Sequence, residues 1–358
     1  KIPYCIKAFS ISGNGPTVVT ENGRTELWNE NYSVGLQLMN ELCSSSGFTS
    51  HSLFMPKILS LKNKYPKDFE ESKYIFSGPE FFIFQLTNNA LTILPEARYV
   101  SAYWDFQLLS ACSISEEKMP SWLSIGQKYG EVQKSIIKDL NDFIKEKSES
   151  GAPKTPSTTS SRDQGNNPFS KAKEFFKKEK SFLIFEEELP VFGAGPDFIA
   201  ALIGTNTLTP GRICDRSGSS EGLNYCVPAC VHSYGVRTLP SVIENLWNVS
   251  VLIPRSGKLS ENKRLFAVKE SIKVLRGIAA QYSFPFPEKL FVTGGQTKNS
   301  GYMKRKEKEL GMSLSLANCD DAELLGDACV AYFAMGKYDS LQSAAKAIVK
   351  EKDFHEDL

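Results

Sequence analysis

Histidine is scarce in this chain: among 358 residues there are three, His51, His232 and His355. Histidine is the side chain that most often serves as a general base or metal ligand near neutral pH. We therefore expect the chemistry of this protein not to depend on imidazole. No metal-ligating residue is predicted, because Cys226-x3-Cys230 has no partner histidine or cysteine at a zinc spacing.

Long apolar runs and an excess of charge are also lacking. No stretch of 18 or more apolar residues occurs, and that is the length that spans a bilayer. The N-terminus has no signal-peptide apolar core. Lys and Arg total 42 against 41 Asp and Glu, a net charge of +1. The sequence therefore predicts neither a membrane partner nor a nucleic-acid partner.

The composition is that of an ordinary globular protein, with 41% hydrophobic and 23% charged residues. A length of 358 residues allows two domains that each bury a core. The eight cysteines are scattered, so we expect reduced thiols and a cytoplasmic location.

One stretch, Leu189 to Asn224, carries most of the functional information. It begins with an apolar run typical of a buried strand end and continues with Gly193-Ala194-Gly195-Pro196, which predicts a turn. Asp197 follows and heads an apolar helix. A carboxylate there is either a plain helix cap or a functional group, because the helix dipole favours its ionised form in both cases.

A second small turn, Ser217 to Gly222, reads Ser-Gly-Ser-Ser-Glu-Gly after a predicted strand. Such a turn exposes successive backbone N–H groups and hydroxyls, which together form a phosphate-binding nest. A carboxylate that can accept a proton and a nest that can hold phosphate predict phosphoryl transfer. The G-x4-G-K-[ST] motif of P-loop enzymes does not occur.

These residues resemble the centre of the FGGY carbohydrate kinases, of the xylulokinase and glycerol kinase type. The pattern G-x-G-x-D-x-x-A-A-x-x-G over residues 193–204, followed by the serine-rich turn, is similar to the family's central motif. Residues 290–299 are similar to its adenosine motif, and residues 323–328 to its E-x-x-x-G-A-A helix start. The resemblance implies an α/β, two-domain actin/hexokinase-like ATPase fold of the ribonuclease H type.

The resemblance also implies roles for individual residues. Asp197 would be the general base on a sugar hydroxyl, and ATP would bring Mg²⁺ held by few protein groups and several waters. The residues implied for the nucleotide are Gly218, Ser219 and Ser220 at the phosphates, and Gly294, Gly295, Gln296 and Asn299 at adenosine. Judged on its residues alone, Gly294-Gly295 is equally consistent with a plain strand-to-helix turn.

The implied domains are an N-terminal kinase domain over residues 1–187 and a C-terminal domain with the ATP motifs over residues 188–358. Asn14, Gly15 and Asp197 would contact the substrate, a sugar or polyol of pentulose or xylulose type. Gly15 and Pro16 bring no hydrogen-bonding side chain, so Asn14 is the polar candidate in its loop. An ordinary turn asparagine is the alternative. A homodimer is kept as one option for the assembly.

Local patterns predict the remaining elements. Glu21-Asn22-Gly23-Arg24 is a hairpin signal. Apolar residues at helical spacing predict helices over 33–43, 128–147, 241–247, 261–282 and 341–349, and Asp320-Asp321 is expected to cap a further helix that ends at Ala334. The Ser, Thr, Pro and Gly of residues 148–168 lack apolar periodicity and predict a disordered surface segment.

One feature of the family has no counterpart in this sequence. The family begins with a phosphate hairpin, D-x-G-T-[ST]-x-[KR], upstream of the strand that corresponds to residues 9–13, whereas this sequence starts at Lys1. The expected N-terminal domain is thus incomplete at its start, in a fragment or in an inactive relative.

Three functions remain open from the sequence: an ATP-dependent sugar kinase, a binding or regulatory protein with the kinase architecture, and an actin-like ATPase that polymerises. The sugar-kinase-like residues 74–105 argue against the third.

Overall fold

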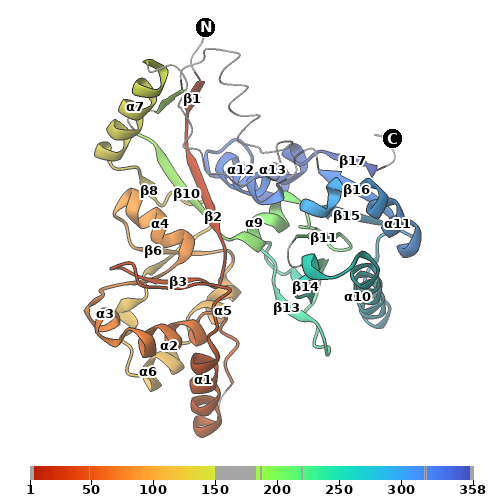
Figure 1. The fold of residues 1–358 in the computed structure, drawn as a ribbon, viewed down its shortest axis with the longest axis horizontal. Helices are drawn as coiled ribbons and strands as arrows, with labels where there is room; N and C mark the ends of the chain where they lie inside the picture. The colour runs from red at the N-terminus through yellow and green to blue at the C-terminus, as the bar shows by residue number, and fades with distance from the viewer. Residues whose placement is uncertain are drawn as a thin grey trace.

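The structure, a computed structural model, describes residues 4–47, 49–149, 183–185, 188–218, 221–317, 319 and 321–354. Within them the chain forms two α/β halves, one built largely from residues 4–149 and the other from residues 197–354 (Figure 1). The segment predicted to be disordered lies outside the described residues from residue 150 onward, as do Ser219 and Ser220. The domain boundary after residue 187 stays a prediction. No helix in the described ranges has the length and apolar character of a membrane span.

Small sheets and short helices make up the first half. One sheet has the order β2-β10-β8, with strands β2 (Phe9–Gly13), β10 (Pro190–Pro196) and β8 (Gly130–Glu131). A second has the order β4-β3-β5, with strands β4 (Thr25–Glu26), β3 (Val18–Thr20) and β5 (Ile75–Ser77). Two further sheets are strand pairs: β6 (Leu91–Leu94) with β7 (Ser121–Ser124), and β1 (Tyr4–Ile6) with β9 (Leu183–Phe185). The main helices are α1 (Ser33–Ser46), α2 (Met55–Lys64), α3 (Pro66–Glu71), α4 (Gly78–Thr87), α5 (Val100–Tyr103), α6 (Phe106–Ala111) and α7 (Lys134–Glu149). The predicted hairpin at residues 21–24 is confirmed, because it joins the antiparallel strands β3 and β4.

A mixed sheet of seven strands organises the second half. Its strands, in the spatial order β13-β14-β12-β11-β15-β16-β17, are β13 (Arg237–Pro240), β14 (Trp247–Ile253), β12 (Glu221–Val227), β11 (Ile213–Ser217), β15 (Lys289–Thr293), β16 (Ser313–Ala317) and β17 (Glu351–Asp353). The helices are α9 (Asp197–Gly204), α10 (Glu261–Tyr282), α11 (Ser300–Leu310), α12 (Ala322–Ala334) and α13 (Leu341–Ile348).

Strand alternation divides the core of this half into two layers, one on each face of the sheet. Ile213, Leu290 and Val292 pack with the apolar stripe of α10, whereas Cys214 and Phe291 belong to the cluster that contains α9, α12 and α13. Because successive strand residues point to opposite faces, both faces of the sheet are covered by helices, and polar residues such as Asp215 and Asn224 are buried among the apolar ones.

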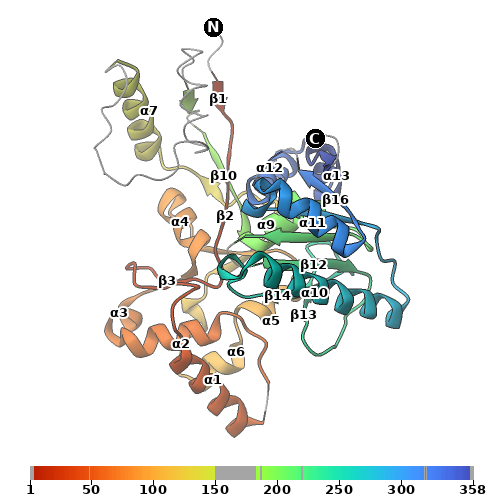
Figure 2. The ribbon, with the colours of Figure 1, turned by 45° about the vertical axis from the view of Figure 1, so that its right-hand side comes forward.

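Two glycines allow α9 and α12 to cross in direct backbone contact. A Cβ at Gly204 would lie 1.8 Å from the carbonyl oxygen of Ala322, and a Cβ at Gly326 would lie 1.8 Å from that of Ala200. In Figures 1 and 2, α9 and α12 lie between the strands β2 and β10 and the sheet of the second half. The crossing therefore brings the N-terminal ends of both helices to the junction of the two halves.

Most of the predicted helices are confirmed. The helix over 261–282 has the predicted ends. Compared with the prediction, α1 ends a few residues later and α13 ends one residue earlier. Asp321 caps α12 by accepting a hydrogen bond from the Leu324 N–H. The amphipathic pattern over 128–147 forms α7 only from Lys134, since Gly130–Glu131 pairs with β10 as β8.

Two local predictions are wrong. Residues 241–247 form no helix: they close the antiparallel hairpin of β13 and β14, with the Ser241 N–H donating to Leu246 and Asn245 at a φ of 63°. Residues 193–196 are no turn either, because β10 continues through them beside β2, with an irregularity between Gly193 and Gly195. Pairing with the distant strand β2 decided the conformation of residues 193–196, and pairing of the flanking strands β13 and β14 decided that of residues 241–247.

Candidate active site

Asp197 lies where two parallel strands end. β10 and β2 are paired with Pro196 opposite Gly13, so Asp197 and Asn14 leave the sheet at the same edge. The side-chain amide of Asn14 donates a hydrogen bond to Oδ2 of Asp197 at 2.9 Å. The structure therefore brings together two of the predicted substrate residues, and Gly15, the third, follows directly after Asn14 in the wall of the same cavity.

The surroundings of Asp197 favour a carboxylate that exchanges a proton. It is the first residue of α9, after Pro196 at the N-cap position, and its side chain is 26% exposed. Burial raises the pKa of Asp197, the nearby Arg216 guanidinium opposes this effect, and Glu323 adds to it. A raised pKa makes the carboxylate a stronger base, and the guanidinium at 4.0 Å favours its ionised form.

Arg216 and Glu323 complete a group of three charges from three elements. Arg216, on β11, donates a hydrogen bond to Oε1 of Glu323 at 2.7 Å, and Glu323 lies in the first turn of α12. Sequence reasoning passed over Arg216 and used Glu323 only as part of a motif. Strand alternation is the signal that could have found Arg216, because it points to the same face as the buried Cys214, toward α9 and α12.

The predicted phosphate turn and the predicted adenosine turn touch. β11 and β15 are parallel neighbours with Arg216 opposite Thr293, so Ser217 and Gly294 leave the same edge. Gly294 has a φ of 96°, and a Cβ on it would lie 2.6 Å from the carbonyl oxygen of Ser217. Both conditions require glycine at residue 294. Of the predicted phosphate residues, Gly218 lines the cavity beside Gly294, whereas Ser219 and Ser220 are outside the described residues.

Gln296 and Asn299 hold the second turn together in this structure. Gln296 donates to the Gly218 carbonyl at 3.2 Å and to the Ser256 hydroxyl at 3.1 Å. Asn299 is the N-cap of α11, accepting from the Tyr302 N–H at 3.0 Å, and its amide donates to Glu261. Gly295, by contrast, has open space where a Cβ would lie. A contact of these residues with adenosine stays a prediction.

A buried ionic network lies behind the phosphate turn, and sequence reasoning missed it. The ammonium of Lys306, on α11, contacts Asp215 and donates to Ser217 Oγ and Glu221 Oε1, both at 3.0 Å. Ser256 donates to the other oxygen of Glu221 at 2.7 Å. Burial opposes ionisation of Glu221, but Lys306 and Ser256 outweigh it and lower its pKa. The network holds the chain on both sides of the phosphate turn, because Ser217 precedes the turn and Glu221 follows it. In the sequence, the network is indicated by polar residues that alternate along the strand at 215 and 217.

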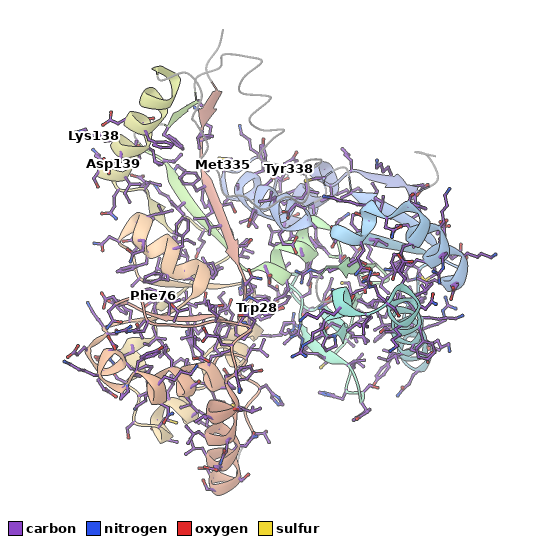
Figure 3. All side chains as sticks on the ribbon, in the orientation of Figure 1. Trp28, Phe76, Lys138, Asp139, Met335 and Tyr338 are labelled. Atoms are coloured by element: carbon purple, nitrogen blue, oxygen red, sulfur yellow. The ribbon has the colours of Figure 1, made fainter. Side chains whose placement is uncertain are left out.

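A cavity of about 380 Å³ opens between the two halves at these residues. Its charged lining consists of Asp197, Arg216, Glu221, Arg237 and Glu323, and its large apolar and aromatic lining of Trp28, Leu53, Phe54, Tyr99, Tyr103, Phe198 and Leu252. Figure 3 shows Trp28 where the first half faces the second. The size is that of a small-molecule site.

Comparison with known proteins gives no match by sequence: no protein-family model matches the chain, and no curated protein does.

Solved structures are similar in fold. Gluconate kinase from Lactobacillus acidophilus aligns at 11% identity with a TM-score of 0.67, over 98% of this chain and 80% of that one. Glycerol kinase from Plasmodium falciparum with ADP aligns at 13% identity and 0.65, over 97% and 78%. Xylulose kinase from Lactobacillus acidophilus aligns at 12% identity and 0.63, over 97% and 79%. The prediction of an α/β actin/hexokinase-like ATPase fold, shared with sugar and polyol kinases, is thereby confirmed.

Proposed function

We propose that this protein transfers the γ-phosphoryl group of ATP to a hydroxyl of a sugar or polyol, with Asp197 as the general base. The observation that supports this most is the position of Asp197. It lies in the cavity between the halves, held by Asn14, and the cavity wall also includes the touching turns at Gly218 and Gly294. The fold shared with sugar and polyol kinases supports the same reaction.

The residues present fit a nucleotide. Gly218 and Gly294 have no side chain, so a nucleotide can approach the backbone of both turns closely, and the open space at Gly295 leaves room for a group above the turn. Within the described ranges, no three His, Cys, Asp or Glu side chains cluster as a metal site. Mg²⁺ would be held mainly by nucleotide phosphates and water, and the carboxylates that line the cavity are Asp197, Glu221 and Glu323.

Phosphoryl transfer requires alignment, charge stabilisation and a proton acceptor, which this chain supplies separately. ATP supplies the phosphoryl group, and the bond to the ADP oxygen breaks as the acceptor oxygen bonds to phosphorus. Asp197 takes the proton from the acceptor hydroxyl, and Asn14 keeps Oδ2 of that carboxylate in place. Arg216 lies near enough to Asp197, at 4.0 Å, to stabilise negative charge that develops between them. Phe54, Tyr103 and Phe198 exclude water from the cavity.

The test is ATP-dependent phosphorylation across a panel of sugars, polyols and sugar acids, with Asp197→Asn beside the wild type. We expect the substitution to lower turnover by about 10²–10⁴-fold, because the amide keeps size and geometry but cannot accept a proton. The dissociation constant of ADP, measured by calorimetry, should change less than about threefold, since the proposal places Asp197 at the acceptor hydroxyl and not at the nucleotide.

Asp105→Asn provides a matched control. Asp105 caps α6, accepting from the Gln107 and Leu108 N–H groups, and Asn is nearly as good a cap. Turnover should therefore stay at the wild-type level. If Asp197→Asn were equally silent, Asp197 would be a cap only. If the wild type bound nucleotide and acceptor without turnover, the function would be that of a binding protein.

A further inference from the structure

We infer that the acceptor is an anionic polyol, a sugar acid with a carboxylate, and that Arg237 binds this carboxylate. The inference rests on the proposed function for the site, and it narrows the substrate class from any sugar or polyol to those of the aldonate type. It is carried by the position and pairing of Arg237, a residue to which neither the sequence motifs nor the base mechanism gives a role.

Arg237 lines the cavity from the edge strand β13. Its guanidinium lies over the Phe198 ring, with its carbon 5.7 Å from the ring centroid. Its Nε is buried and has no hydrogen-bond partner. Across the described part of the chain, its side chain makes no ion pair. A buried donor of a permanent cation left unsatisfied is costly, so a ligand that supplies an acceptor is expected there.

The other charged side chains of the cavity contact one another or Lys306, and none contacts Arg237. Arg216 is hydrogen-bonded to Glu323 and lies 4.0 Å from Asp197, so one cation faces two carboxylates. Arg237 has instead Tyr99 and Arg216 as its charged or titratable neighbours. Within the described residues, Arg237 is therefore a cation of the cavity wall without a carboxylate partner, and a carboxylate fits a guanidinium with two parallel hydrogen bonds.

The place of Arg237 assigns it to the acceptor rather than to the nucleotide. It contacts Phe198, the residue after the proposed base, and it neighbours Tyr99 of the first half. The nucleotide turns leave β11 and β15, whereas β13 is separated from β11 by β12 and β14. With a strand spacing of about 4.8 Å, the backbones of β13 and β11 are roughly 14 Å apart.

The other residues that line the cavity are consistent with a ligand that binds through its charge. The loop after β2 contributes Asn14, already bonded to Asp197, and then Gly15 and Pro16, which have no polar side chain. Trp28, Phe54 and Phe198 add apolar surface. The loop thus offers no free polar side chain for neutral hydroxyls, and an ionic contact with Arg237 would add to the binding free energy of an acid.

The experiment compares acids with the alcohols of the same carbon chain. Binding of D-gluconate, D-glucitol, D-xylonate and xylitol is measured by calorimetry with ADP present, and by intrinsic tryptophan fluorescence. Phosphorylation by ATP is measured separately for each. The variants are Arg237→Met, Arg237→Lys and, as control, Arg276→Met. Arg276 is an exposed arginine over the Phe286 ring, outside the cavity.

We expect the wild type to bind the acids roughly tenfold to hundredfold more tightly than the alcohols. Arg237→Met should remove this preference with little change for the alcohols or for ADP. Arg237→Lys should restore part of it, and Arg276→Met should leave it intact. Equal or weaker binding of the acids by the wild type would overturn the inference. So would loss of ADP affinity alone in Arg237→Met, which would place Arg237 at the phosphates.

The two proposals fail in different ways. Selective binding of the acids without phosphorylation would support the role of Arg237 and contradict the kinase. Phosphorylation of neutral polyols without a preference for acids would support the kinase and contradict the role of Arg237.

Discussion

At the scale of single residues, Gly294 links the geometry of the site to stability. Gly294→Ala would place a Cβ 2.6 Å from the Ser217 carbonyl oxygen at a φ of 96°. We expect it to lower the free energy of unfolding by about 1–3 kcal/mol, measured in urea, because both the backbone conformation and the contact disfavour a side chain. The affinity for ADP should fall as well, since the strain moves the two turns apart.

Gly295→Ala is the neighbouring control for that substitution. No atom lies within 4 Å of a Cβ built there, so the free energy of unfolding should change by less than about 0.5 kcal/mol. Equal losses in the two variants would mean that the turn responds to any side chain rather than to the contact with Ser217.

Some residues of the site can be identified from the local sequence pattern, and others cannot. Asp197 and Gly294 stand out because small residues and a lone carboxylate interrupt apolar segments. Arg216 and Arg237 do not stand out, because a single arginine in a strand has no distinguishing spacing. Only the inclusion of β13 and β11 in one sheet brings both arginines to the cavity.

At the scale of elements, the crossing of α9 and α12 positions Asp197 and Glu323. Gly326→Ala would insert a methyl group 1.8 Å from the Ala200 carbonyl oxygen. The helices must separate to accept it, which we expect to cost roughly 3 kcal/mol of unfolding free energy. Turnover should fall too, because Glu323 and Arg216 move away from Asp197. Thermal unfolding and kinetics on the same sample check both effects.

Gly277→Ala tests the same change in a helix without a crossing. Gly277 lies in α10 with nothing within 4 Å of a Cβ. Alanine should stabilise the protein by about 0.5–1 kcal/mol, because glycine is the poorer helix former. A stabilising Gly326→Ala would contradict the close contact of α9 with α12.

At the scale of the whole molecule, Asp327 ties the two halves together. It lies on α12 and accepts a hydrogen bond from Ser12 of β2 at 2.9 Å. Burial raises the pKa of Asp327 to about 7, against the hydrogen bond from Ser12, and Asp321 and Glu323 add to the rise. The unfolded chain has a value of about 3.9. The protonated form therefore contributes stability that is full below pH of about 4 and is lost as the pH rises through about 7.

Asp327→Asn should remove this pH dependence. The amide stays neutral and can still accept from Ser12, so the unfolding free energy of the variant relative to wild type should rise by about 1–3 kcal/mol between pH 5 and pH 8. Asp139→Asn, on the exposed side of α7 (Figure 3), should show no such rise. Urea unfolding at four pH values measures the difference. A constant difference would mean that Asp327 ionises normally in the folded protein.

Short-range information in the sequence determined the helices with clear stripes and caps, such as α10 and α12, and the hairpin at residues 21–24. It also determined the turn at Gly294 and the carboxylate at the start of α9, because their conformations depend on neighbours within a few residues. From their order the actin/hexokinase-like fold was predicted, and the solved structures confirm that fold.

Only the tertiary structure decided the features that depend on distant partners. Residues 193–196 took a strand form because β2, far earlier in the chain, pairs with them. The buried Lys306 has its place because three polar side chains of other elements surround it. Arg237 enters the cavity through sheet order alone. Such contacts join residues far apart in the chain, and no local pattern encodes which of them will meet.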